Sequence, residues 1–278
     1  VFSIFAASFW NAVVLARNQN KKQVITKLLY RRQKHTVMKI IGVIPARYQS
    51  SRFPGKPLAD ICGKPMIWWV YEQCRKVKEL EDVYVATDDE RIFDTCKQLN
   101  MQVIMTSTEH KTGTDRVGEV ARKTDGDLYI NIQGDEPLIE PAMIRDVISI
   151  FDNTDVVMGS LRKQITDTDE INAYSTVKVV VDKNEDALYF SRSVIPSQAR
   201  SSDAKIFRHV GIYAYTRDFL FKFITLPQRE LEIAESIEAI RAIENGYKIR
   251  VRETQFSSIG VDLPEHIKLV EEAIMNKK

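Results

Sequence analysis

Residues 44–58, IPARYQSSRFPGKPL, decide the fold of this chain, because they turn the apolar run at 40–44 into a cationic loop. A buried strand that ends in a phosphate-binding loop has this pattern. Small residues let backbone N–H groups approach a polyphosphate, and Arg47, Arg52 and Lys56 can neutralise its charge.

A solvated loop is the alternative interpretation of this segment. Three cations and a glycine within ten residues, directly after a buried strand, favour phosphate binding instead. The segment is neither a Walker loop nor a dinucleotide fingerprint, since it has neither the GxxxxGK[ST] nor the GxGxxG spacing.

The chain then alternates short apolar runs with amphipathic segments. This alternation predicts a three-layer α/β sandwich with a largely parallel sheet. Ligands of such sheets bind beyond the carboxyl ends of the strands, where residues 45–47, 87–89 and 133–135 fall. The expected strands are 40–44, 83–86, 102–105 and 128–132, and the expected helices are 65–77, 90–99, 114–123 and 141–151.

The pattern changes after Val156. The polar stretch 195–207 predicts an exposed loop or a subunit-contact arm. Further strands are expected at 177–181, 210–215 and 248–253, with one helix over 231–245 ended by Gly246 and a terminal helix starting at 262–265.

Composition indicates an ordinary globular protein whose 278 residues fit one large domain, or a domain with a lobe. The three cysteines have no metal-ligand spacing, so we expect reduced thiols and a cytoplasmic location. Residues 38–278 carry 33 basic and 38 acidic residues, because seven of the 40 Lys and Arg residues lie in 1–37. This mildly acidic body disfavours a nucleic-acid partner.

Residues 1–37 differ from the rest of the chain. Residues 1–16 are mostly apolar and precede a basic run, but they are shorter than the roughly 20 residues of a membrane span. No basic region precedes them, as a secretory signal would require. We expect a leader that is disordered or not native, with the native chain starting at Met38 and one domain over 38–278. A membrane anchor or an organellar targeting segment is the alternative, so membrane contact is expected only if 1–37 is native.

Two carboxylates follow probable strands, Asp135 in QGD (133–135) and Asp262 in GVD (260–262). Either one alone could simply cap a turn. Two carboxylates at strand ends, opposite a cationic loop, predict an oxygen-ligand Mg²⁺ site in which substrate phosphates complete the coordination shell.

Other polar residues carry weaker signals. Gly113, in HKTGTDR (110–116), and the helix N-terminus that it opens can hold a nucleotide, although an ordinary capped helix start is the alternative. Thr87 and Asp88 either meet the base or cap a helix. A later group would suit an acidic sugar, although each member alone is more often structural: Arg192, His209, Tyr213, Glu235 and Glu238.

Ordered motifs over about residues 39–272 resemble those of the 3-deoxy-manno-octulosonate cytidylyltransferase family, the CMP-Kdo synthetases. The matching segments are IPARY (44–48), FPGKPL (53–58), GKPMI (63–67), VATDDE (85–90), GTDR (113–116), NIQGDEP (131–137), VKVV (177–180), LYFSR (188–192), HVGIY (209–213), ENG (244–246) and GVD (260–262).

The resemblance implies a Rossmann-like nucleotide-diphospho-sugar transferase fold, a smaller sugar-binding and dimerisation lobe at about 156–230, and a homodimer. It also implies that CTP and a 3-deoxy-ulosonic acid give a CMP-sugar and diphosphate, with Mg²⁺ as cofactor. The implied catalytic residues are Arg47, Lys56, Asp135 and Asp262, of which the two Asp residues hold the metal. Nucleotide contacts are implied for Arg47, Ser51, Arg52, Lys56, Thr87, Asp88, Gly113 and Arg116, and sugar contacts for Gln133, Arg192, His209, Tyr213, Glu235 and Glu238.

One departure from the family pattern is Ala239, where the family usually carries Gln beside the expected sugar contacts. The loss of that amide favours a variant sugar, such as 8-amino-Kdo. A nonulosonic acid is a second alternative. A non-catalytic nucleotide-binding scaffold is a third, although a scaffold would gain nothing from Lys56, Asp135 and Asp262 together. The sequence leaves open a lipopolysaccharide, capsule or plant cell-wall pathway.

Overall fold

Strand β1 (Ile40–Ala46) forms the centre of the sheet because both of its faces are apolar. Its alternate residues pack into hydrophobic cores on opposite sides. It pairs in parallel with β4 (Asp82–Thr87) on one edge and with β6 (Leu128–Asn131) on the other. A parallel sheet that is apolar on both faces requires helices on both, which explains the three layers.

The computed structural model describes residues 38–50, 52–152, 155–200 and 203–276. The other strands are β2 (Asp60–Ile61), β3 (Lys64–Pro65), β5 (Val103–Met105), β7 (Met158–Ile165), β8 (Lys178–Val181), β9 (Ala187–Ser191), β10 (Ile206–Thr216) and β11 (Arg250–Glu253). The helices are α2 (Met66–Arg75), α3 (Glu90–Gln98), α4 (Gly113–Lys123), α5 (Pro141–Ile148), α6 (Thr168–Asn172), α7 (Arg217–Phe223), α8 (Glu230–Glu235), α9 (Ile240–Glu244) and α10 (His266–Asn276), with 3₁₀ turns η1 (Lys56–Leu58) and η2 (Ser149–Phe151).

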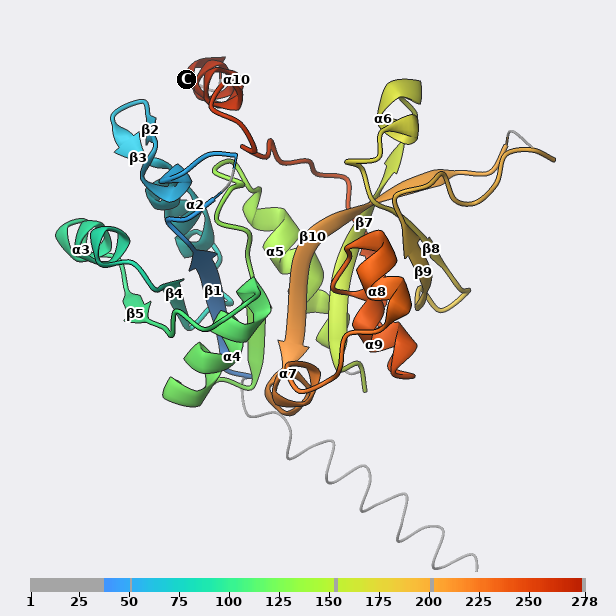
Figure 1. The fold of residues 1–278 in the computed structure, drawn as a ribbon, viewed down its shortest axis with the longest axis horizontal. Coiled ribbons are helices and arrows are strands. Elements are labelled where there is room, and N and C mark those ends of the chain that lie inside the picture. The colour runs from blue at the N-terminus through green and yellow to red at the C-terminus, as the bar shows by residue number, and fades with distance from the viewer. Residues whose placement is uncertain (1–37, 51, 153–154, 201–202, 277–278) are drawn as a thin grey trace, which may run out of the picture. The chain divides into compact units, whose positions relative to one another are not determined.

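The main sheet has the strand order β11-β7-β10-β6-β1-β4-β5, and the β8–β9 pair joins it through β10. Strands β6, β1, β4 and β5 are parallel, whereas β10 runs antiparallel to β6 and β7. Figure 1 shows β10 as the long strand that separates this parallel part from β8 and β9. The chain order reverses around β1, which makes the carboxyl ends of β1 and β6 the switch point where ligands of such sheets bind.

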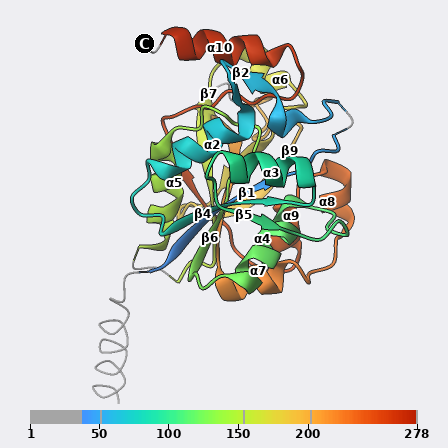
Figure 2. The same ribbon diagram turned by 90° about the vertical axis from the view of Figure 1, so that its left-hand side faces the viewer.

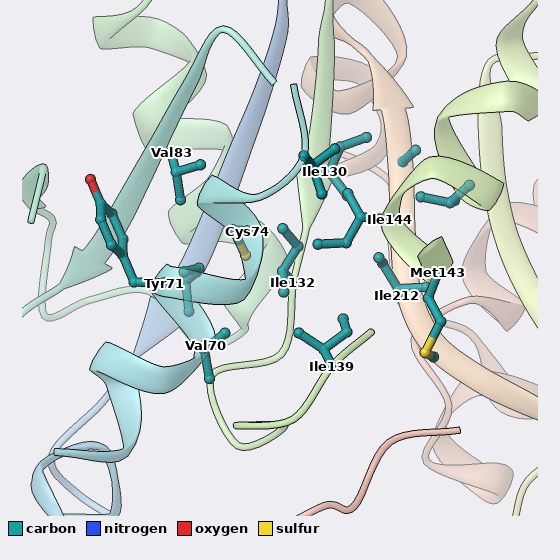
Figure 3. Close-up of a cluster of buried hydrophobic side chains, with 14 of the residues drawn as sticks. Val70, Tyr71, Cys74, Val83, Ile130, Ile132, Ile139, Met143, Ile144 and Ile212 are labelled. Atoms are coloured by element: carbon teal, nitrogen blue, oxygen red, sulfur yellow. The ribbon is translucent and has the colours of Figure 1, made fainter. Parts of the chain in front are cut away.

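Two apolar cores separate the three layers. Helices α2, α3 and α5 cover one face of the sheet, and α4, α7 and α9 cover the other (Figure 2). Figure 3 shows the first core, where Val70 and Cys74 of α2 and Ile144 of α5 pack around Ile132 and Ile212.

A third, smaller core attaches the C-terminal helix. Val270 and Ile274 of α10 pack with Ile61 of the β2–β3 hairpin and with Val261. The backbone N–H of Val261 donates to the carbonyl of Asp135 over 2.8 Å. This bond brings the segment that carries Asp262 to the loop that follows β6.

The predicted α/β sandwich is confirmed, as are all strands and helices expected between residues 40 and 151, with small shifts at their ends. The strands expected near 177–181, 210–215 and 248–253 and the terminal helix are also present. Strand β7 and helices α6 and α7 were not predicted. The calls on residues 1–37 and Ser51 lie outside the described residues.

The single helix predicted over 231–245 is wrong. The structure has two short helices, α8 and α9, because Ser236 adopts a left-handed conformation with φ 52° and ψ 47°. The break lets Arg241 form a buried ion pair with Glu232, and it buries Ile237 and Ala239 while Ile233 stays exposed. None of the helices in the described part of the chain combines the length and the apolar character that crossing a membrane requires.

Candidate active site

A cavity of about 540 Å³ opens at the carboxyl ends of β1 and β6, at the switch point of the sheet. Its lining includes both loops that the sequence singled out and the start of α4. Eight of the predicted site residues line it: Arg47, Arg52, Lys56, Gly113, Arg116, Gln133, Asp135 and Asp262.

Two ion pairs cross this cavity. Lys56 Nζ lies 2.7 Å from Asp135 Oδ2, and both side chains are partly buried. Arg52 Nη2 lies 2.9 Å from Asp262 Oδ1, and both of these side chains are more than half exposed. The third cation, Arg47, is exposed, and its Nη1 donates to the carbonyl of Lys111 over a long distance of 3.4 Å.

The donor set fits a hard divalent cation. Asp135 and Asp262 are brought together by the Val261 backbone bond, and both carboxylates face the cavity. No cluster of three or more His, Cys, Asp or Glu side chains with metal-binding geometry occurs among residues 38–50, 52–152, 155–200 and 203–276. A Mg²⁺ ion here would therefore take its remaining ligands from phosphate oxygens and water, as such ions commonly do.

Close packing shapes the two loops. The N–H of Gly55 donates to the carbonyl of Tyr48 over 2.8 Å, and Gly55 has φ 72°, which favours glycine. The Arg91 guanidinium stacks 3.3 Å above the Tyr48 ring, under this turn. In the loop after β6, a Cβ on Gly134 would lie 2.8 Å from the carbonyl oxygen of Pro45 in β1, so only glycine lets this loop approach the strand so closely.

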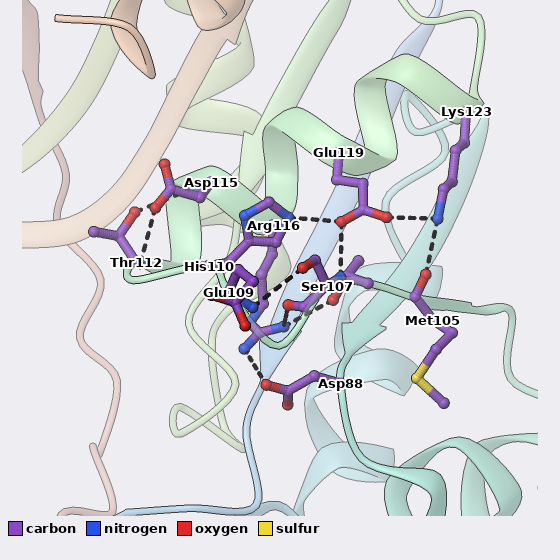
Figure 4. A network of polar contacts seen from close by, with 11 residues as sticks. Asp88, Met105, Ser107, Glu109, His110, Thr112, Asp115, Arg116, Glu119 and Lys123 are labelled. Carbon is purple, nitrogen blue, oxygen red and sulfur yellow. Dashed lines mark hydrogen bonds and ion pairs between the residues drawn. The ribbon is translucent and has the colours of Figure 1, made fainter.

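Arg116 is held by a buried network (Figure 4). Its guanidinium donates to Asp88 over 2.5 Å, to Thr106 over 2.8 Å and to the carbonyl of Ser107 over 3.1 Å. Arg116 therefore supports the wall of the cavity and holds Asp88 in place. The Thr87 hydroxyl is buried and accepts from the Asp89 N–H over 3.2 Å. The residue that caps α3 is Asp89 itself, whose carboxylate accepts from the Arg91 N–H over 3.0 Å.

Helix α4 begins at the cavity with Gly113. Thr112 and Asp115 form a reciprocal capping box, so the helix start is both capped and directed at the cavity. The partial positive charge of such a terminus favours an anion nearby.

Five of the six predicted sugar contacts lie outside the lining of this cavity. Arg192 directly follows β9, His209 and Tyr213 lie on β10, and Glu235 and Glu238 lie at and just after the end of α8. Gln133 connects the cavity to β10, because it lines the cavity and donates to the Gly211 carbonyl over 2.9 Å. His209 lies 2.9 Å from the Ser160 hydroxyl, and its ring packs on Tyr213. Burial, with the nearby Arg208 charge, lowers the pKa of His209 to about 3, so this ring is neutral.

Arg192 and Glu235 form a second group. The Glu235 carboxylate accepts from the Ser191 hydroxyl over 2.7 Å and from the Arg192 N–H over 2.9 Å. Desolvation acts to raise the pKa of Glu235, but these bonds, with one from Tyr189, leave that pKa below its ordinary value. The Arg192 guanidinium donates to backbone carbonyls, including that of Glu235 over 2.8 Å.

Glu238, just after α8, is connected to α4, the helix that begins at the cavity. Its carboxylate accepts from the hydroxyl of Thr114 in α4 over 2.5 Å. Desolvation raises the pKa of Glu238 above its ordinary value. Its Oε1 has no hydrogen-bond partner among the described residues, although Arg241 lies 3.6 Å away. Ala239 is buried in the apolar core beneath, so its methyl group packs with hydrophobic neighbours.

Two polar residues of this region, Glu136 and Lys178, are not among the site residues predicted from the sequence. Glu136 follows Asp135 directly, and burial, together with the Asp135 charge, raises the pKa of Glu136 to about 7. Lys178 is fully buried in β8. A lysine inside the apolar run VKVVV was the available signal for Lys178, because an ammonium buried on such a strand needs acceptors.

The model of the family described as "Cytidylyltransferase" matches residues 41–249. This match covers most of the chain and both loops of the cavity. The chain therefore belongs to the cytidylyltransferase family.

Relatives narrow this family further. A 3-deoxy-manno-octulosonate cytidylyltransferase from Solibacter usitatus is 50% identical over 234 residues, which cover 84% of this chain and 93% of the relative. An 8-amino-3,8-dideoxy-manno-octulosonate cytidylyltransferase from Shewanella halifaxensis is 47% identical, over 84% of this chain and 98% of its own. A solved CMP:2-keto-3-deoxy-manno-octonic acid synthetase complexed with CTP is 43% identical, with a TM-score of 0.83 over 86% of this chain and 100% of that one. Within its family, the chain groups with the 3-deoxy-manno-octulosonate cytidylyltransferases.

Proposed function

We propose that this protein transfers the cytidylyl group of CTP to 3-deoxy-manno-octulosonate (Kdo), which gives CMP-Kdo and diphosphate. The observation that carries this proposal is the presence of two ion pairs across the cavity. Their cations can bind a triphosphate, and their carboxylates can bind a metal ion. The similarity to a structure solved with CTP supports the same assignment.

In this reaction the anomeric hydroxyl of the sugar attacks the α-phosphorus, a new O–P bond forms, and the bond to the β-phosphate breaks. Arg47, Arg52 and Lys56 would bind the triphosphate and then stabilise the departing diphosphate. Asp135 and Asp262 would hold Mg²⁺, which when bound neutralises phosphate charge and favours deprotonation of the hydroxyl. The protein otherwise contributes orientation, which accounts for a large share of the rate in such transfers.

The sugar would lie against β9, β10 and α8, with Arg192 toward its carboxylate and with Gln133, His209, Tyr213, Glu235 and Glu238 toward its hydroxyl groups. The short bond between Glu238 and Thr114 supports this placement, since it connects these residues to the helix that borders the nucleotide cavity.

The 8-amino sugar is the second candidate substrate. The Shewanella halifaxensis relative carries that activity in its name, and at 47% identity it is about as similar to this chain as the Solibacter usitatus relative at 50%.

The deciding experiment measures diphosphate release with CTP and Mg²⁺, comparing Kdo with its 8-amino analogue, on a chain that begins at Met38. Release with Kdo is the expected result. Release with the analogue alone would make the amino sugar the substrate. No release with either sugar would refute the proposed reaction and favour another acidic sugar or a non-catalytic role.

We further propose a cytoplasmic homodimer. Three large apolar side chains of β9 and α8 are exposed, Leu188, Leu231 and Ile233, as an interface would require. The three cysteines are free, which supports a reducing compartment. Light scattering coupled to gel filtration should give twice the chain mass, and Ile233→Glu should lower it.

A further inference from the structure

Lys178 is a buried cation with an unusual set of partners. Its side chain is 0% exposed. Its Nζ donates to three backbone carbonyls, those of Ala173 over 2.9 Å, Thr176 over 2.8 Å and Arg192 over 2.8 Å. An ammonium has three donors, so all of them are used. None of these three acceptors is a carboxylate.

The three carbonyls belong to the two segments that position Arg192. Ala173 and Thr176 lie in the loop after α6, and between them the carbonyl of Tyr174 accepts from Arg192 Nη1 over 3.0 Å. The third carbonyl is that of Arg192 itself. Lys178 therefore holds both the backbone from which Arg192 extends and the loop that its guanidinium contacts.

The register of the strands places Lys178 in the middle of the proposed sugar region. It pairs with Arg208 of β10 on one side and with Ser191 of β9 on the other. The residues that follow these two partners are His209 and Arg192. Figure 1 shows β8 beside both strands.

The charges around Lys178 leave an excess of positive charge. Glu235, bound to the Arg192 backbone N–H, is one carboxylate against the two cations Lys178 and Arg192. Arg208, the neighbour in β10, is paired with Glu170 at 3.6 Å. A neutral side chain would avoid the cost of desolvating an ammonium, so a buried unneutralised cation has its clearest use where an anion binds.

We propose that Lys178 is a positioning residue for the carboxylate of the sugar substrate: it holds Arg192 in place and adds positive potential. This inference rests on the proposed function, since it assumes that an acidic sugar binds beside Arg192. It predicts that Lys178 affects the sugar and leaves the nucleotide unaffected.

The test compares the Michaelis constants of Lys178→Met for Kdo and CTP, measured by diphosphate release, with CTP binding measured separately by calorimetry. We expect the KM for Kdo to rise about tenfold or more, while the KM for CTP stays within about twofold. Val179→Ala is the matched control, because it removes buried volume from the same strand without changing charge. It should lower the melting temperature and leave both constants unchanged.

Equal rises in both constants, or no rise in either, would overturn the positioning role. If Lys178→Met fails to bind CTP and so has not folded, Lys178→Gln replaces it, because an amide keeps donors but not the charge. An unchanged KM for Kdo in that variant would also overturn the proposal. Failure of the proposed function itself is distinguishable, because the unsubstituted chain would then show no Kdo-dependent release.

Discussion

The proposed nucleotide half and the proposed sugar half of the site hold their charged side chains in different ways. In the nucleotide half, Lys56 and Arg52 are each paired with the carboxylate of an aspartate that lines the cavity. In the sugar half, Lys178 and Arg192 donate mostly to backbone carbonyls.

This difference has a physical consequence for how each half binds its ligand. The Arg52–Asp262 ion pair is more than half exposed and contributes little to stability, so its members can take new partners when phosphates and a metal arrive. A bond to a backbone carbonyl inside a fold cannot be exchanged without moving the chain. We therefore expect the nucleotide half to rearrange locally on binding and the sugar half to be preformed.

The largest expected effect is on turnover, and it concerns the nucleotide half of the site. Asp135→Asn should lower the turnover number by about a thousandfold, or about 4 kcal/mol of barrier, because it weakens the metal site and releases Lys56 from its pair. Diphosphate release measures this loss. Asp218→Asn, an exposed change at the start of α7, is the control and should be silent. Turnover that survives in Asp135→Asn would refute the metal assignment.

A second prediction concerns the contact between Gly134, in the loop after β6, and the end of β1. Gly134→Ala should lower the free energy of unfolding by about 3 kcal/mol, because the added methyl group meets the Pro45 carbonyl. Thermal denaturation measures this loss. Gly260→Ala is the matched control, since a Cβ there would meet nothing within 4 Å. Equal melting temperatures for the two variants would contradict the close approach of this loop to β1.

The third prediction tests whether the sugar half is preformed around a neutral histidine. His209 has a pKa of about 3 in the fold against an ordinary value of 6.5, so between these values the unfolded chain binds a proton that the native state excludes. Stability should therefore fall as the pH drops through this window, by about 2 kcal/mol between pH 7 and pH 5.

The measurement for this third prediction is the difference in unfolding free energy between the natural chain and His209→Gln at each pH. The difference is needed because Glu136, whose pKa is raised to about 7, contributes with the opposite sign over part of the same range. A pH-independent difference would show that His209 is not held neutral.

The smallest expected effect on stability is that of Arg52→Gln, and it tests whether the cations of the nucleotide half can exchange partners. Arg52→Gln should change the free energy of unfolding by less than about 1 kcal/mol, because both members of its ion pair are more than half exposed. The same change should raise the KM for CTP by about tenfold, since a phosphate contact is lost. A large loss of stability would show that this pair is structural and not exchangeable.

Much of the fold could be predicted from the sequence because the strands of the parallel part are buried on both faces and appear as apolar runs. Strand β7, with the sequence MGSLRKQI, has no such run, since Arg162, Lys163 and Gln164 are only partly buried. The break at Ser236 was also hidden, because the residues around it form a continuous helical pattern.

The part of the candidate site that could be predicted is the part whose functional residues lie in short sequence motifs. The cationic loop and Asp135 each follow a strand directly, so the topology of the sheet brings them together. The three partners of Lys178 are backbone carbonyls, which carry no side-chain signal, and only the folded chain shows them. Arg116 lines the cavity, and its bonds to Asp88, Thr106 and Ser107 are likewise visible only in the folded chain, because these partners come from other segments.

The bond from the Val261 N–H to the Asp135 carbonyl has a consequence for synthesis of the chain. Domains fold as they emerge from the ribosome, so the parallel strands and the cationic loop can assemble first. Asp262 is made 127 residues after Asp135 and arrives with the segment that α10 anchors. A chain that stops before Val261 would therefore carry only one of the two carboxylates proposed to hold the metal, and would lack the helix that anchors the other.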